Sequence, residues 1–283
     1  MRRPQWNRLI DRTDDKVVVV AFIFLFFSMI SALASAAISS VEGLEFSQVQ
    51  LMGSNELEIT QGDTNSLKIR GKEDDLDPAP FVVDGDTLRL GITSDGKGVR
   101  NMKFKLTVKD LKELLLQGSG EVFVKPLVVG DLLVSVEGSG VVRMFDLEAA
   151  ALELRVIGSG TLQAVNVVAQ TARLNMKGSG DLQLGSLVAG SVKAHLAGSG
   201  DVLVENEGRT DKIEVGVMGS GDIDMAKLSA QQAKVTIMGS GDVELSVVQS
   251  LDAEILGSGD LLYHGDPKVS RSIMGSGDVN RQY

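Results

Sequence analysis

Gly118-Ser119-Gly120 is the tripeptide on which the predicted fold rests, because the chain repeats it nine times. Successive copies start 18 to 21 residues apart, and a period of this size predicts a repeat architecture. The other copies begin at Gly138, Gly158, Gly178, Gly198, Gly219, Gly239, Gly257 and Gly275.

The residues on both sides of each tripeptide alternate between apolar and polar. The position two residues before it is apolar in every copy, from Leu116 to Ile273. The second position after it is also apolar in every copy, from Val122 to Val279. The fourth positions on either side are apolar in all copies except the last. This spacing of two beside glycines predicts a half-buried strand on each side of a tight corner.

One such unit cannot bury its apolar side, so the units must stack. Stacked strands hydrogen-bond to the next layer at about 4.8 Å, and glycine corners allow a positive φ and close backbone approach. The sequence therefore predicts an all-β, parallel β-helix or β-solenoid of about 20-residue coils over residues 113–283. A leucine-rich horseshoe has a similar period but requires an Asn or Cys ladder, and the repeats carry none.

Residues 38–112 are less regular and are predicted to form an N-terminal β cap. Phe46–Asp63 resembles one degenerate coil, with Gly53-Ser54-Asn55 at its corner. Short alternating strands are expected at residues 67–70, 87–90 and 103–108. We expect this region to contain the first coils plus insertions that cover one open end of the stack.

The N-terminus carries the signals for export. Residues 1–16 form a basic-leaning leader. Residues 17–37 contain no charge, and this segment of 21 residues is long enough for a transmembrane helix. The flanking charges place the N-terminus in the cytoplasm. Small residues near Ala36 also fit signal-peptide cleavage, so residues 17–37 are either a retained membrane anchor or a removed signal. In both cases the body is extracytoplasmic, in the periplasm or at the cell surface.

Charge and cysteine content exclude several classes of function. The chain has a net charge of −10, and residues 1–37 carry +2, so the exported body carries −12. This acidic body argues against nucleic acid and anionic membrane surfaces as partners of the rod. The chain has no cysteine, which excludes disulfides and cysteine nucleophiles.

Three segments in order resemble one known family. They are Glu58-Ile-Thr-Gln-Gly-Asp63, Asp84-Gly-Asp-Thr-Leu88, and Leu114–Gly120 with its recurring Gly-Ser-Gly-Asp. Over about residues 44–283 the chain is similar to the auto-transporter adhesin head (GIN) domain family. The resemblance implies a bacterial envelope protein with an export signal and a right-handed β-helical body, and it implies no particular activity.

An acidic residue follows the tripeptide in the last six copies. Oxygen ligands on adjacent coils could bind a cation such as Ca²⁺. Alternatively, each Asp caps its own corner by accepting hydrogen bonds from backbone N–H groups, and we expect this structural role. The six residues are Asp181, Asp201, Asp222, Asp242, Asp260 and Asp278.

An enzyme is the less favoured interpretation. β-Helical enzymes that cleave acidic polysaccharides need a cluster of acids and bases that breaks the repeat, whereas these acids recur in register. His195 and His264 fall in different coils without a Ser or Cys beside them. We therefore expect no catalytic residues and no cofactor.

An apolar stripe is predicted just before the corner in four consecutive coils. Exposed apolar stripes mark contacts with other molecules or with further copies of the chain, unless a loop covers them. The stripe predicts either a binding module for a glycan or an envelope protein, or a scaffold that assembles as a homo-oligomer. Its residues are Met218, Met238, Leu256 and Met274.

The last coil places arginines where earlier coils have interior residues. Arg271 replaces Ala253, and Arg281 replaces Tyr263. A charge in an interior position is costly unless it reaches water, so the two arginines predict the end of the stack. They form either a polar cap that blocks further strand pairing or a docking surface.

Overall fold

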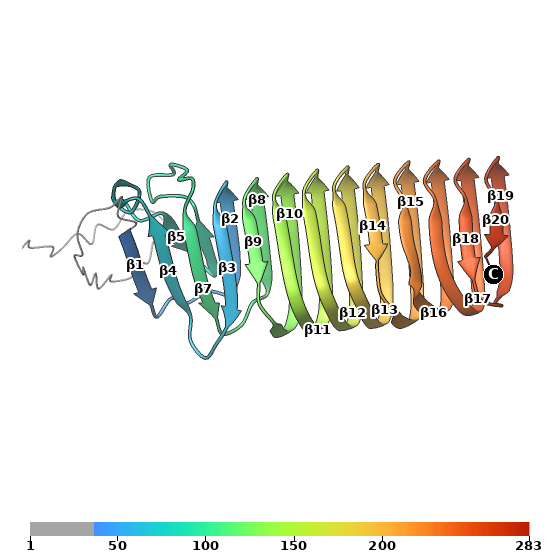
Figure 1. Ribbon diagram of the computed structural model, residues 1–283, viewed down its shortest axis with the longest axis horizontal. Coiled ribbons are helices and arrows are strands. Elements are labelled where there is room, and N and C mark those ends of the chain that lie inside the picture. The colour runs from blue at the N-terminus through green and yellow to red at the C-terminus, as the bar shows by residue number, and fades with distance from the viewer. Residues whose placement is uncertain (1–36, 283) are drawn as a thin grey trace, which may run out of the picture.

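The computed structural model describes residues 37–282, which form one all-β rod (Figure 1). The predicted leader, residues 1–16, and residues 17–36 of the predicted anchor or signal lie outside the described residues. Within the described part of the chain, the only helical element is the short 3-10 helix η1 (Glu73–Asp75). The predicted β-solenoid with an irregular N-terminal cap is confirmed.

Parallel strands stacked coil upon coil form the regular part of the rod. Val134, Leu154 and Leu174 are direct partners in three successive coils, so each residue pairs with its equivalent one repeat later. The strands are β8 (Glu113–Gly118), β9 (Glu121–Val124), β10 (Leu127–Gly138), β11 (Val141–Gly158), β12 (Thr161–Gly178), β13 (Asp181–Gly198), β14 (Asp201–Val204), β15 (Gly208–Gly219), β16 (Ile223–Gly239), β17 (Val243–Gly257), β18 (Leu261–His264), β19 (Lys268–Gly275) and β20 (Val279–Arg281).

Each full coil has three sides, although the sequence pattern indicated only two. In β12 the alternation of buried and exposed residues breaks at 165–166 and again at 170–171, where two consecutive side chains are exposed. The chain turns at these places as well as at the Gly-Ser-Gly corner. A short third side, 167–169, lies between them and points Val167 and Ala169 into the core.

One continuous apolar core fills the rod, and it consists of the positions that the repeat predicts. The residues two and four positions from each corner are buried in every inner coil. The exceptions are in the last two copies: Tyr263 is partly buried, Ile273 is 38% exposed, and Arg271 and Arg281 are exposed. Burial ends there because no further coil follows within the described residues.

The glycine corners allow the coils to approach closely. A Cβ atom on Gly198 would lie 2.1 Å from the carbonyl oxygen of Gly178, and the φ of Gly198 is +140°. A Cβ on Gly200 would lie 2.1 Å from the carbonyl oxygen of Gly180. Between these glycines, the exposed serine of each copy donates its backbone N–H to the glycine carbonyl one coil earlier, as Ser199 does to Gly178 at 2.9 Å. Only glycine fits both positions, because the space of a Cβ is already occupied by backbone.

The N-terminal cap covers one end of the stack (Figure 1). The predicted degenerate coil is a true layer, because Gly53 pairs with Gly118 and accepts the N–H of Ser119. The chain then doubles back, so that β6 and β7 lie on the far side of β2 and β3. The cap strands are β1 (Ala37–Glu42), β2 (Gln48–Gly53), β3 (Glu56–Gln61), β4 (Ser66–Gly71), β5 (Phe81–Asp84), β6 (Thr87–Leu90) and β7 (Lys103–Val108).

Antiparallel pairing ends the stack at the cap. β4 pairs antiparallel with β7, β1 pairs antiparallel with β4, and β5 pairs antiparallel with β6. The buried Asn55 ties the cap to the first corner. Its amide nitrogen donates to the carbonyls of Met52 and Val99, both at 2.7 Å, and its oxygen accepts the N–H of Met102 at 2.9 Å.

The Gly200→Ala substitution should destabilise the rod strongly. Its methyl group would clash with the Gly180 carbonyl, and overpacking of this kind costs about 1–3 kcal/mol. Urea unfolding followed by circular dichroism should show a lower midpoint. Gly130→Ala is the matched control, since nothing lies within 4 Å of a Cβ at that position. Equal midpoints for the two variants would contradict the close-approach explanation.

Candidate functional site

The predicted stripe is a straight row on one side of the rod. Met218, Met238, Leu256 and Met274 are direct strand partners from coil to coil. Met218 is 56% exposed, Met238 40% and Met274 73%, while Leu256 is partly buried. Within residues 37–282 no segment covers this row. We call these four residues the apolar row. The strands that precede the Gly-Ser-Gly corners form one side of the rod, and we call its outward surface the pre-corner face.

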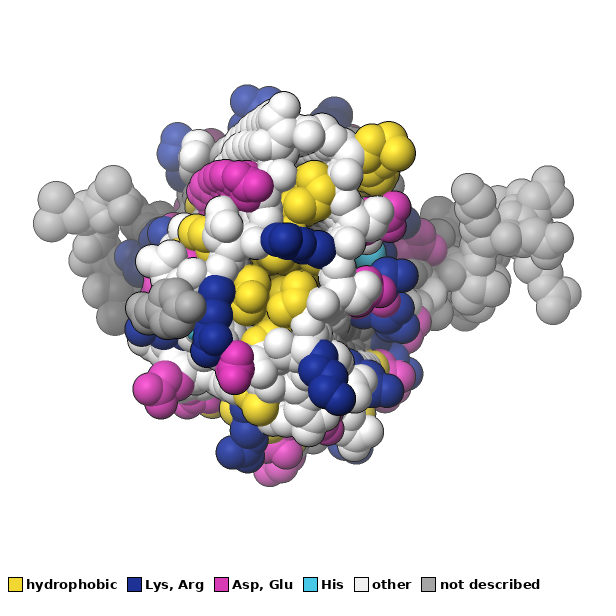
Figure 2. Space-filling model, turned by 90° about the vertical axis from the view of Figure 1, so that its right-hand side faces the viewer, with side chains coloured by type: hydrophobic (Ala, Val, Ile, Leu, Met, Phe, Trp, Pro, Cys, Tyr) yellow, Lys and Arg dark blue, Asp and Glu magenta, His cyan; other side chains and the backbone are white. Residues whose placement is uncertain are grey.

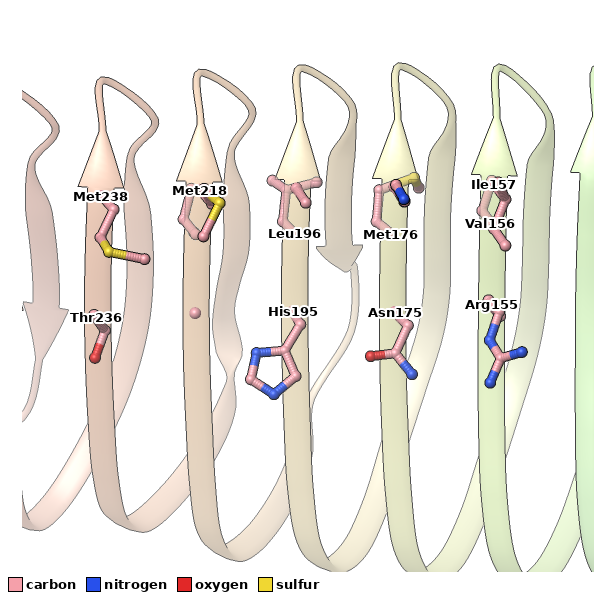
Figure 3. A pocket seen from close by; sticks show the side chains of 14 residues that line it. Arg155, Val156, Ile157, Asn175, Met176, His195, Leu196, Met218, Thr236 and Met238 are labelled. Atoms are coloured by element: carbon pink, nitrogen blue, oxygen red, sulfur yellow. The ribbon is translucent and has the colours of Figure 1, made fainter.

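The apolar row borders a shallow open hollow of about 450 Å³ on the pre-corner face. Ile157, Met218 and Met238 supply apolar surface, and His195 and Thr236 lie beside them. Figure 3 shows the His195 ring directed toward the coil of Met218, and Met238 directed toward the same coil. We call this the apolar hollow.

Gly216 creates room for this arrangement. It lies between His195 and Thr236 in the strand register, and a Cβ there would lie 2.8 Å from Nδ1 of His195. The missing side chain lets the imidazole lie across the neighbouring coil. This glycine is not part of a corner, so its role differs from that of the repeated tripeptide.

A second hollow, of about 330 Å³, lies on the same face farther from the Gly-Ser-Gly corner. Lys193, Lys212 and Lys234 line it together with one acid, Glu214. Lys193 donates to Glu214 at 2.7 Å, and this bond is the main cause that holds the pKa of Glu214 below its ordinary value. We call this the basic hollow. It carries excess positive charge on a body whose net charge is −12.

No sequence pattern predicted the basic hollow. Lys193 and Lys234 lie two coils apart in one row, with Glu214 between them. Lys212 lies at the bend between the third side and the pre-corner face, in register with Thr171. Because no two lysines are equivalent in neighbouring repeats, an alignment of the repeats does not reveal the cluster. The available signal was the local density of lysine in three consecutive coils of an otherwise acidic body.

The aspartates after the tripeptide form hydrogen bonds between coils. The carboxylate of Asp242 accepts the backbone N–H of Asp260 at 2.7 Å, and Asp260 accepts that of Asp278 at 2.8 Å. Asp201 and Asp222 act in the same way toward the next coil. Each carboxylate thus caps the following corner rather than its own, which differs from the predicted pattern. Asp181 lies outside this arrangement, since the Asp201 N–H donates to the Gly180 carbonyl.

The two histidines lie in different coils. Nε2 of His264 contacts Oε1 of Glu244 at 2.7 Å, and His195 stands exposed in a different coil. Among residues 37–282, no group of three or more His, Cys, Asp or Glu side chains is placed to hold a metal ion. No helix in the same range has the length and apolar character needed to cross a bilayer.

The two predicted terminal arginines lie at the C-terminal end of the rod. Arg271 occupies the register of Ala253 and donates to the carbonyl of Val279 at 3.4 Å, while Arg281 pairs with Asp266 at 2.8 Å. Figure 2 looks onto this end and shows basic side chains lying over exposed apolar ones. Val269 and Ile273 remain 39% and 38% exposed, so the arginines cover the core only in part.

The Asp242→Asn substitution should leave the thermal midpoint unchanged or slightly raised. The amide oxygen can still accept the Asp260 N–H, and repulsion between carboxylates about 4.8 Å apart is reduced. Asp242→Ala should lower the midpoint by about 2–4 °C, the equivalent of one lost hydrogen bond. Asp252→Ala, which removes an exposed acid within β17 that is not at a corner, is the control. EDTA and added Ca²⁺ should not move the wild-type midpoint; a rise with Ca²⁺ that Asp242→Asn abolishes would instead establish a cation site.

Three solved structures from two Parabacteroides species have the same fold. A "putative adhesin" from Parabacteroides merdae is 18% identical, with a TM-score of 0.66 over 88% of this chain and 96% of that one. A "putative lipid binding protein" from Parabacteroides distasonis is 28% identical, with a TM-score of 0.64 over 88% and 97%. A second "putative adhesin" from that species is 18% identical, with a TM-score of 0.63 over 88% and 98%.

Comparison of the sequence with protein families gives a match over most of the chain. No curated protein sequence matches significantly. The model of the family described as "Putative auto-transporter adhesin, head GIN domain" matches residues 45–207 and 203–267, which include the cap apart from β1, both hollows and most of the glycine corners. The chain therefore belongs to the auto-transporter adhesin head GIN domain family.

Proposed function

We propose that the chain is an exported, non-catalytic, adhesin-like binding module of the bacterial cell envelope. It engages its partner through the pre-corner face. The observation that carries this proposal is the apolar row, which runs through four consecutive coils and in which three of the four side chains are between 40% and 73% exposed. A straight row of exposed apolar side chains on a rigid sheet is typical of a contact surface.

The absence of enzymatic activity is part of the proposal. Its support is that the acidic residues recur in register with the coil and that four of them are engaged by backbone N–H groups. The family and the similar structures are described as adhesins or as a binding protein, which agrees with a non-catalytic role.

The class of partner is suggested by the surface and by one relative. The hollow beside the apolar row offers Met and Ile side chains, which favour an apolar part in the ligand. The structure described as a "putative lipid binding protein" is 28% identical to this chain and supports the same class. We propose that the partner is an envelope component with an apolar portion.

Retention of residues 17–37 as a membrane anchor completes the proposal. The 21 uncharged residues and the preceding basic leader support an N-terminus in the cytoplasm and a tethered body outside it. The mass of the full chain purified from membranes should therefore include residues 1–16. A mature N-terminus that begins after Ala36 would show that the chain is released instead.

The Met218→Ser, Met238→Ser double variant should weaken partner binding by about tenfold or more, because two apolar contacts are lost. The full chain is tested by surface plasmon resonance against purified peptidoglycan, lipopolysaccharide and phospholipid vesicles. Val165→Ser with Val168→Ser is the matched control, since these residues are 51% and 48% exposed on other sides of the rod. Equal binding by both double variants would contradict the proposed contact surface. Chemical conversion of any of the three probes would contradict the proposed non-catalytic role.

The scaffold alternative is favoured by one observation, the partly exposed core at the C-terminal end beside the 73% exposed Met274. Sedimentation of the wild-type chain distinguishes it from a binding module. A mass that does not change with concentration supports the binding module, whereas oligomers that grow with concentration support a scaffold.

A further inference from the structure

The pre-corner face of β13, β15 and β16 carries three parallel rows of different chemistry. The strand register defines each row across three coils. Starting far from the corner, the rows are Lys193, Glu214 and Lys234, then His195, Gly216 and Thr236, and finally Ala197, Met218 and Met238. The face therefore changes from charged to hydrogen-bonding to apolar in one direction.

The basic hollow at one side of this gradient can bind an anion. Lys193 is the hydrogen-bonded partner of Glu214, whereas no ion pair is found for Lys212 or Lys234 within residues 37–282. Both of these lysines are exposed. Asp252 pairs with Lys234 in the strand register and Asp211 precedes Lys212, so acids bound the cluster there, while Arg173 extends the positive charge by one coil beyond Lys193. Such ammonium groups donate strong hydrogen bonds to a phosphate or carboxylate.

The spacing between the hollows sets the size of the ligand. Met238 lies four positions after Lys234 along β16, which corresponds to about 13 Å at the rise of a strand. The apolar row continues from Met218 to Met274 over three further layers, about 14 Å along the rod. His195 and Thr236 offer hydrogen-bonding groups between the charged and apolar ends.

We propose that this face binds a single anionic amphiphile, with its anionic head group in the basic hollow and its hydrocarbon chain on the apolar row. The occupant is a monomeric lipid-like molecule rather than a free inorganic anion, because the positive charge and the apolar surface lie on one face with a single row of residues between them. This inference rests on the proposed binding function and specifies the ligand class and orientation.

The test uses dodecyl phosphate below its micelle concentration as the probe. The full chain is labelled with ¹³C at the methionine methyl groups, so that Met218 and Met238 report on the apolar hollow. Dodecyl phosphate should shift both signals with saturation, and inorganic phosphate should shift neither. Neutral dodecyl maltoside should bind at least about tenfold more weakly, because it leaves the lysine contacts unmade.

Charge reversal tests the head-group site. Lys212→Glu with Lys234→Glu should weaken dodecyl phosphate binding by about tenfold or more, and the loss should shrink as salt is raised. Lys227→Glu reverses the charge of an exposed lysine away from this face and should have no effect. Gly216→Leu, which fills the space between the rows, should abolish the methionine shifts while the two lysines remain.

The outcomes separate this inference from the proposed function. If Met218→Ser with Met238→Ser weakens binding to an envelope probe but the lysine reversals leave dodecyl phosphate binding unchanged, the ligand inference is wrong and the binding module stands. Equal binding of dodecyl phosphate and dodecyl maltoside would also overturn the inference. Binding to anionic vesicles without any shift from monomeric dodecyl phosphate would assign the surface to a membrane instead.

Discussion

Close backbone contact between equivalent glycines is the constraint on which the rest of this structure depends. At each corner two glycines lie against the carbonyl oxygens of the preceding coil, at distances that leave no room for a Cβ atom. Since the corner is short and stacked directly, the strands on either side are held in unshifted register. That register aligns the core residues, the apolar row and the aspartates, because each is one position repeated from coil to coil.

The repeat pattern predicted the core well because burial in a stacked coil depends on a two-residue period. It did not reveal the third side of the coil. Val167 and Ala169 lie between paired exposed residues, and these interruptions are irregular in sequence from one copy to the next. Nor did it reveal the order of layers in the cap. The placement of β6 outside β2 depends on long-range pairing, for which residues 38–112 contain no repeated signal.

The candidate site divides in the same way. The apolar row could be predicted because its members share one position in the repeat. The basic hollow and Gly216 could not, since they depend on unlike residues in neighbouring coils: Lys193 beside Glu214, and a glycine beside His195. The aspartates were predicted to accept backbone N–H groups, but the direction of the bond depends on which corner lies above the carboxylate.

Variation in coil length is confined to one region of the cross-section. The coil from Gly198 to Gly219 has an extra residue near Asn206, and the 18-residue coils are shortened in the equivalent region, where the pairing of β16 with β17 shifts register. Every change in length therefore falls between the strand that follows one Gly-Ser-Gly corner and the strand that precedes the next. A foreign peptide inserted at Asn206 would project from the side of the rod. The same architecture can therefore serve as a rigid scaffold that displays peptides at a fixed spacing along the axis of the rod.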